Sequence, residues 1–241
     1  MRCKLCLQEA TLRNSHIVPE FLYKKIYDEK GRMMVISDRG PPWQQKGRRE
    51  RLLCDHCEQL LNERYEKPFH AWWKEAVPRQ LPQDARQVRF KTHDYVGFRL
   101  FHLSVLWRAS VALHRDWNKV WLGPHEERIR KLLLDFDPGP PGQYQLVAEI
   151  MLLPGGVVNH KMVSSPIRYR QDGRYIYEMI YAGCIWWTNV SYRYPALAPV
   201  ELKTDGSMIA EVTDALDYTP ALRMAAKFRL RKLKGLRDHS G

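Results

Sequence analysis

The chain has 241 residues, of which 44% are hydrophobic and 27% are charged, so it can bury a core without disulfide bonds and has the composition of a globular protein. No apolar run approaches the roughly 18 residues that a membrane span needs, and the first residues lack the apolar stretch of a secretory signal. These features argue against a membrane or exported protein, and we expect a cytoplasmic one.

The net charge of +12 is unevenly distributed along the chain. Residues 1–80 carry 16 Lys and Arg against 11 Asp and Glu, residues 81–219 carry 16 against 15, and residues 220–241 carry 7 against 1. An excess of positive charge at both ends favours a polyanionic partner, nucleic acid first, with DNA ahead of RNA. The alternative is a basic tail that only keeps the protein in solution.

Four of the five cysteines form two pairs with one spacing, Cys3-x-x-Cys6 and Cys54-x-x-Cys57. Two intervening residues let one tight turn direct both sulfurs to a single metal ion, and two such pairs complete a tetrahedral site. We therefore predict a structural zinc ion, with a redox-active pair as the alternative. Cys184 lies in an apolar run and is expected to be an inert buried thiol.

The first third of the chain is predicted to combine short elements with one longer helix. Pro19 can open a helix over 20–27, and four apolar residues over 33–36 predict a short buried strand. After the second cysteine pair, apolar residues at helical spacing predict a helix over 58–75. Two prolines and several polar residues over 77–87 mark a boundary.

Beyond this boundary the pattern changes from helical spacing to alternation. Helices are expected over 94–117 and 123–136. The alternating part predicts an antiparallel sheet, with strands over 144–152, 157–163, 167–170, 175–181 and 184–189. A last helix, opened by Thr219 and Pro220, carries a basic stripe that we consider a candidate nucleic-acid contact; the stripe consists of Arg223, Lys227, Arg231 and Lys234.

The predicted fold class is therefore α+β. A zinc-bound module is expected over 1–80, followed over 88–241 by a helical and antiparallel-sheet region that ends in the basic helix. A homo-oligomer is left open by the sequence.

Three motifs occur in order in the first 70 residues: Cys-x-x-Cys, then Ser15-His16-Ile17-Val18-Pro19, then Leu52-Leu53-Cys-Asp-His-Cys-Glu58. Here the chain resembles the HNH (His-Asn-His) endonucleases that carry a four-cysteine zinc clip on a ββα-metal, treble-clef-like core. The resemblance covers under a third of the chain. It implies a metal-dependent endonuclease that hydrolyses nucleic-acid phosphodiester bonds with magnesium or manganese.

The resemblance also implies roles for individual residues. His16 corresponds to the general base, and a neutral imidazole with a pKa near 6.5 can take a proton from water at physiological pH. Glu58 corresponds to the cation ligand at the start of the helix, where its hard oxygens suit magnesium. Asn62 and Glu66 follow on the same helix face and could supply a second ligand or orient His16. Such an enzyme requires the His16 ring to face the Glu58 carboxylate across an open cleft.

Three positions depart from the family pattern. Ser15 stands where an aspartate or histidine ligand is common, Arg49 stands near the position of the middle asparagine, and Glu58 replaces the last histidine or asparagine. The alternative function is therefore a zinc-containing module without catalytic activity that binds nucleic acid or another protein. Basic residues around the motifs are candidate phosphate contacts, with a solvated hairpin as the alternative; they are Arg13, Lys46, Arg48, Arg49 and Arg51.

Overall fold

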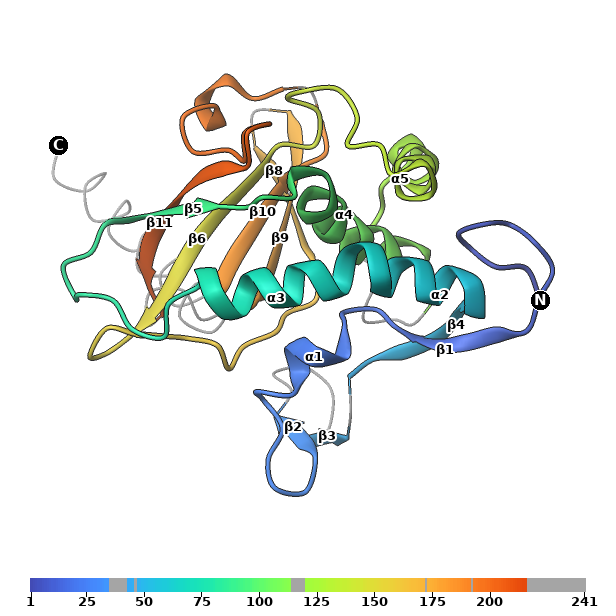
Figure 1. The fold of residues 1–241 in the computed structure, drawn as a ribbon, viewed down its shortest axis with the longest axis horizontal. Coiled ribbons are helices and arrows are strands. Elements are labelled where there is room, and N and C mark those ends of the chain that lie inside the picture. Colours follow the sequence, from blue (N-terminus) through green and yellow to red (C-terminus); the bar gives the residue numbers. More distant parts are fainter. Residues whose placement is uncertain (35–42, 46, 114–119, 172, 192, 216–241) are drawn as a thin grey trace, which may run out of the picture.

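The structure is a computed structural model that describes residues 1–34, 43–45, 47–113, 120–171, 173–191 and 193–215. It has mixed α+β architecture: helices cover one face of a seven-stranded sheet, and a small hairpin-and-helix unit lies beside them (Figure 1). In the described part of the chain, no helix is both long and apolar enough to cross a membrane.

The N-terminal unit is built on an antiparallel hairpin of β1 (Leu12–His16) and β4 (Arg49–Cys54). In this register His16 lies opposite Arg49, although 32 residues separate them in the sequence. The helix α2 (Asp55–Leu61) begins directly at the end of β4, with Cys54 as its N-cap. The remaining elements of the unit are α1 (Glu20–Tyr23), β2 (Arg32–Met34) and β3 (Trp43–Gln45).

The helix predicted over 58–75 is present and begins three residues earlier. It consists of α2, a π-helical segment (Asn62–Glu66) and α3 (Lys67–Ala76) in one continuous run. Its buried side chains recur four residues apart, which is the spacing of one helix face; they are Leu61, Tyr65, Phe69 and Trp73. The earlier start is consistent with Asp55 and Glu58 in the first turn, where the helix dipole favours acidic side chains.

The large sheet has the strand order β5-β11-β6-β10-β9-β8, and β7 pairs with β6. It was predicted to be antiparallel, but β11 runs parallel to β6, so the sheet is mixed. Its strands are β5 (Gln87–Lys91), β6 (Leu146–Leu153), β7 (Val157–Val158), β8 (Ile167–Gln171), β9 (Arg174–Tyr181), β10 (Cys184–Asn189) and β11 (Ser207–Asp214).

The core lies between this sheet and the helices. The long helix α4 (Tyr95–Val111) is apolar on most sides and packs against α3 and α5 (Pro124–Asp135). The rings of Phe69 and Phe101 stack with centroids 3.8 Å apart, and Trp186 of β10 meets Phe69 edge-on. One apolar cluster runs from Cys3 and the N-terminal unit to the sheet, so residues of both predicted domains share a core.

Several predicted elements differ in extent from those observed. The helix predicted over 20–27 ends at Tyr23, and the helix predicted over 94–117 ends at Val111, because Ala112 is extended. The strand predicted over 157–163 has two residues. A short 3-10 helix (Pro195–Leu197) was not predicted. The predicted last helix lies outside the described residues, and with it Arg223, Lys227, Arg231 and Lys234.

Candidate functional site

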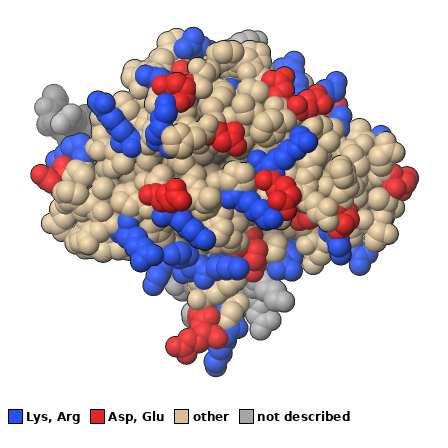
Figure 2. All heavy atoms as spheres, viewed as in Figure 1, with Lys and Arg blue, Asp and Glu red and all other residues tan. Residues whose placement is uncertain are grey.

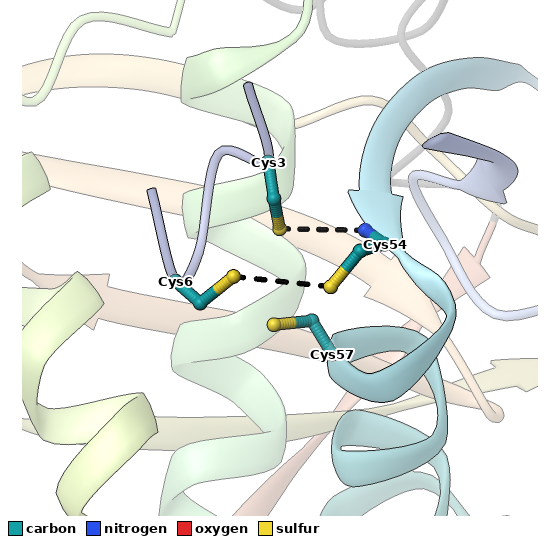
Figure 3. A group of neighbouring side chains, drawn as sticks. All are labelled: Cys3, Cys6, Cys54 and Cys57. Carbon is teal, nitrogen blue, oxygen red and sulfur yellow. Dashed lines mark hydrogen bonds between the residues drawn. The ribbon is translucent and has the colours of Figure 1, made fainter. Parts of the chain in front are cut away.

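The four cysteines of the two pairs come together at one end of the N-terminal unit (Figure 3). Cys3 and Cys6 lie on the N-terminal turn, while Cys54 and Cys57 lie at the junction of β4 and α2. All four sulfurs lie within 4.8 Å of one another, and none is in a disulfide bond. Among the described residues, no other group of three or more His, Cys, Asp or Glu side chains is close enough to share a metal ion.

The spacing of the sulfurs fits a tetrahedral metal ion. The sulfurs of Cys6 and Cys54 are 3.8 Å apart, and zinc–sulfur bonds of about 2.3 Å place two tetrahedral ligands at about that separation. The backbone N–H of Cys54 donates to the sulfur of Cys3 over 3.3 Å, as expected for a thiolate ligand. These four cysteines could therefore hold a metal ion such as zinc.

Without a metal ion, negative charge within the cysteine cluster is favoured at Cys3, whereas burial raises the pKa of Cys54 and the hydrogen bond with Cys3 raises that of Cys57. A hydrogen bond with Cys57, together with backbone hydrogen bonds, lowers the pKa of the Cys3 thiol to about 4. Arg130 of α5 donates from Nη1 to the backbone oxygen of Leu5, 2.6 Å away, in the turn between Cys3 and Cys6. A guanidinium so placed offsets part of the charge that four thiolates bring to a divalent ion.

His16 lies at the end of β1, next to two charged side chains. Its Nε2 accepts a hydrogen bond from Nε of Arg49 over 2.7 Å, and the same nitrogen is in contact with the Glu20 carboxylate. Burial lowers the pKa of His16 to about 4; Glu20 opposes this shift, and Arg49 and Arg108 add to it. His16 is therefore neutral at physiological pH, as a general base must be.

Glu58 contacts the residue before His16 rather than His16 itself. The Ser15 hydroxyl donates to Oε2 of Glu58 over 2.7 Å, which joins the end of β1 to the first turns of α2. Burial raises the pKa of Glu58, against the effect of this hydrogen bond. The carboxylate in contact with His16 is that of Glu20, which the sequence did not single out. The structure thus unites Ser15 with Glu58, and His16 with Glu20 and Arg49.

A buried arginine from α4 supports the end of β1. Arg108 is 1% exposed, and its Nη1 donates to Oε1 of Glu66 over 2.8 Å and to the backbone oxygen of His16 over 3.1 Å. Glu66 is therefore linked to His16 through Arg108, which bonds to the backbone oxygen of His16 and not to its ring. The sequence indicated Glu66 by its helix face, but Arg108 is 92 residues from His16 and lies on a helix that was expected only to fill the core.

The other predicted residues occupy varied positions. Asn62 begins the π-helical segment, half-buried, and its side chain has no hydrogen bond within the described part of the chain. Arg13 forms an exposed ion pair with Asp55. Arg48 directly precedes β4, and Arg51 lies within β4, opposite Asn14 of β1. Lys46 lies outside the described residues.

A basic surface that the sequence did not indicate lies next to this site. It consists of exposed Lys24 and Lys25 directly after α1, Lys74 on α3 and Arg79 shortly after α3, and no ion pair involves them among the described residues. Burial is the main cause that lowers the pKa of the half-buried His70, and the charges of Lys74, Lys24 and Lys25 lower it further. Lys and Arg side chains gather in the lower left of Figure 2, where Figure 1 places α1 and the end of α3.

No protein-family model, curated protein or solved structure significantly matches this chain. Function must therefore be argued from the site itself.

Proposed function

We propose that this protein is a metal-dependent nuclease that hydrolyses phosphodiester bonds, with a structural zinc ion on Cys3, Cys6, Cys54 and Cys57. One observation carries the proposal: at the end of β1, Ser15 is hydrogen-bonded to Glu58 of α2, and the next residue, His16, contacts Glu20 and Arg49. The turn that carries Cys3 and Cys6, the β1–β4 hairpin and the helix that starts at the second cysteine pair also support a ββα-metal, treble-clef-like module.

His16 is proposed as the general base. Its Nε2 is held by Arg49 and Glu20, and Nδ1 has no partner in the described part of the chain. For Nδ1 to accept the proton of an attacking water, the neutral imidazole must carry its own proton on Nε2 and donate it to Glu20 rather than accept from Arg49. Glu20 then stabilises the imidazolium that forms. Arg49 stands near the expected asparagine position, and its charge beside Nε2 helps to keep the resting imidazole neutral.

Glu58 and Ser15 are proposed to hold the catalytic cation. Both offer oxygen atoms, which magnesium and manganese prefer, and one carboxylate with water and substrate phosphate is a usual set for magnesium. When bound, the cation neutralises charge on the phosphate oxygens. The Ser15–Glu58 hydrogen bond holds both oxygens in position for it. Asn62, one turn beyond Glu58, is proposed as a second ligand or a substrate contact.

The basic surface supports nucleic acid as the substrate. Lys24 and Lys25 directly follow α1, Lys74 lies on α3, and α1 itself carries Glu20, the partner of His16. Cations without ion-pair partners bind phosphates at little cost and orient a strand without reading its sequence.

One observation favours the second candidate, a nucleic-acid-binding module without catalytic activity. The polar groups of the site bond to one another, Ser15 to Glu58 and His16 to Arg49, as they would in a purely structural network. The two candidates share the zinc site and the basic surface, and they differ in whether His16 and Glu58 do chemistry.

The deciding experiment is cleavage of plasmid DNA, single-stranded DNA and RNA by zinc-loaded protein with magnesium or manganese. Loss of a general base lowers the rate by about 10²- to 10⁴-fold, so His16→Ala should cut at least 100-fold more slowly than wild type. Glu58→Gln keeps an oxygen for Ser15 and should also lose activity, whereas the exposed His93→Ala should not.

If wild type binds all three nucleic acids and cuts none, or if His16→Ala cuts as fast as wild type, the nuclease proposal is wrong. The first of these results would establish the binding module instead. Zinc content is measured in every variant, because a variant that has lost only the general base keeps its zinc, whereas an unfolded variant does not.

A further inference from the structure

A cavity with both polar and apolar walls lies apart from the candidate active site. Its volume is about 260 Å³, and it is bounded by the first turns of α4, the segment 141–146 before and at the start of β6, and the segment 193–204. In Figure 1 these segments meet at the upper edge of the sheet, whereas α1 and β1 lie below the long helix formed by α2 and α3. The backbone N–H of Leu202 donates to the oxygen of Leu146 over 2.8 Å and holds two of the walls together.

The wall contains a buried arginine with no carboxylate partner. Arg99 is 4% exposed and donates to the Tyr95 hydroxyl over 2.6 Å and to the backbone oxygen of Gln143. Its Nε is buried without any hydrogen-bond partner, and no ion pair involves Arg99 within the described residues. Arg108, on the same helix, shows the usual arrangement, because its buried guanidinium is paired with Glu66. A buried charge without a counter-charge is costly, so Arg99 points to an anion that the cavity receives.

Two further cations border the cavity. Arg193 crosses Gly142, where the φ of +77° suits glycine and where a Cβ would lie 2.9 Å from Cδ of Arg193. Lys203 is exposed at the rim. Glu201 is the single acidic residue of the wall, and its Oε1 lies 3.5 Å from Nη2 of Arg193. Three cations face one carboxylate, which leaves two positive charges.

We propose that this cavity binds a small organic phosphate monoester. The two uncompensated charges match a phosphate dianion, and a guanidinium with free N–H groups suits its oxygens. Pro141, Leu146 and Leu202 supply an apolar wall for the organic part. Inorganic phosphate alone would leave this wall uncovered. The proposal does not depend on the nuclease function.

The test is isothermal titration calorimetry on the full zinc-loaded chain. The probes are inorganic phosphate, glycerol 3-phosphate and the four ribonucleoside 5′-monophosphates, with glycerol, adenosine and succinate as controls. At least one monoester should bind more tightly than inorganic phosphate, and its uncharged counterpart should not bind. Arg99→Met should weaken that binding by about 10- to 100-fold, as expected for lost charge-assisted hydrogen bonds.

Lys203→Met lies at the exposed rim, should leave the fold intact and should weaken binding to a smaller degree. Arg89→Met, an exposed arginine of β5 that does not line the cavity, should bind like wild type. The proposal is overturned if no monoester binds, or if Arg99→Met and Lys203→Met both bind as tightly as wild type. The proposal would also be overturned if inorganic phosphate bound as tightly as every monoester, or if succinate bound most tightly of all the probes.

Discussion

The N-terminal unit and the seven-stranded sheet bury comparable kinds of apolar side chain but differ in what completes their structure. In the sheet, aromatic rings such as Trp186 and Tyr181 pack against α3 and α4, and Cys184 is a free buried thiol among them. In the N-terminal unit, two strands and a helix are joined at a cluster of four cysteines. The unit thus combines apolar packing with a site that can hold metal, whereas the sheet has packing alone within the described residues.

The polar residues of the N-terminal unit lie at the end of β1 away from the cysteine cluster, directly before the fully buried Ile17 and Val18. That end can present Ser15, His16 and Arg49, which face Glu58 and Glu20. Polar groups therefore gather at the edge of the hydrophobic core, where hydrogen bonds and charged partners hold them.

The largest expected effect tests this comparison at the cysteines. Cys57→Ser should lose bound zinc and unfold the N-terminal unit, because structural zinc contributes roughly 10–16 kcal/mol of apparent binding free energy in small finger peptides. Cys184→Ala removes a buried thiol from the sheet and should retain full zinc content, with a destabilisation of about 1–2 kcal/mol. Metal analysis and circular dichroism measure both. Equal zinc content in the two variants would break the comparison.

The next effect concerns the contact between the two regions. Glu66→Gln leaves the buried Arg108 without its counter-charge and should lower the free energy of unfolding by about 3–5 kcal/mol. Urea denaturation gives the value, and Glu63→Gln, which loses only an exposed pair with Lys67, should change it by less than about 1 kcal/mol. If the two variants are equally stable, Arg108 does not anchor β1 through Glu66.

A smaller effect is expected in the sheet core, where the contribution of His102 to stability depends on pH. Burial lowers the pKa of His102, whose Nδ1 lies 2.6 Å from the Tyr181 hydroxyl, well below 6.5. In the unfolded chain His102 takes up a proton near pH 6.5, so its contribution is present above that pH and is lost as the pH falls. The slope is at most about 1.4 kcal/mol per pH unit.

His102→Gln keeps a hydrogen-bonding group for Tyr181 and removes this titration. Urea midpoints between pH 7.5 and 5.5 should therefore fall less steeply for the variant than for wild type. Parallel slopes would show that His102 is not the titrating group.

The sequence predicted features that depend on local patterns. The two cysteine pairs, the helix after the second pair and the alternating strands before and after Gly183 follow from spacing alone. It did not predict β5 and β11. The edge strand β5 carries the polar residues Gln87, Arg89 and Lys91, so its sequence lacks the apolar pattern of a strand. It also missed Arg108, Glu20 and the basic surface, since these depend on which distant elements meet. Ser15, His16 and Glu58 were identified as candidate site residues only through the resemblance to HNH endonucleases.

The most direct test of the account is a manganese titration followed by electron paramagnetic resonance. It would be carried out on zinc-loaded wild type, Glu58→Gln and Glu75→Gln, an exposed acid of α3, each with single-stranded DNA present. Wild type and Glu75→Gln should bind one Mn²⁺ with equal affinity, and Glu58→Gln should bind it at least about tenfold more weakly. Equal binding by all three proteins, or none by wild type, would contradict a catalytic cation at Ser15 and Glu58.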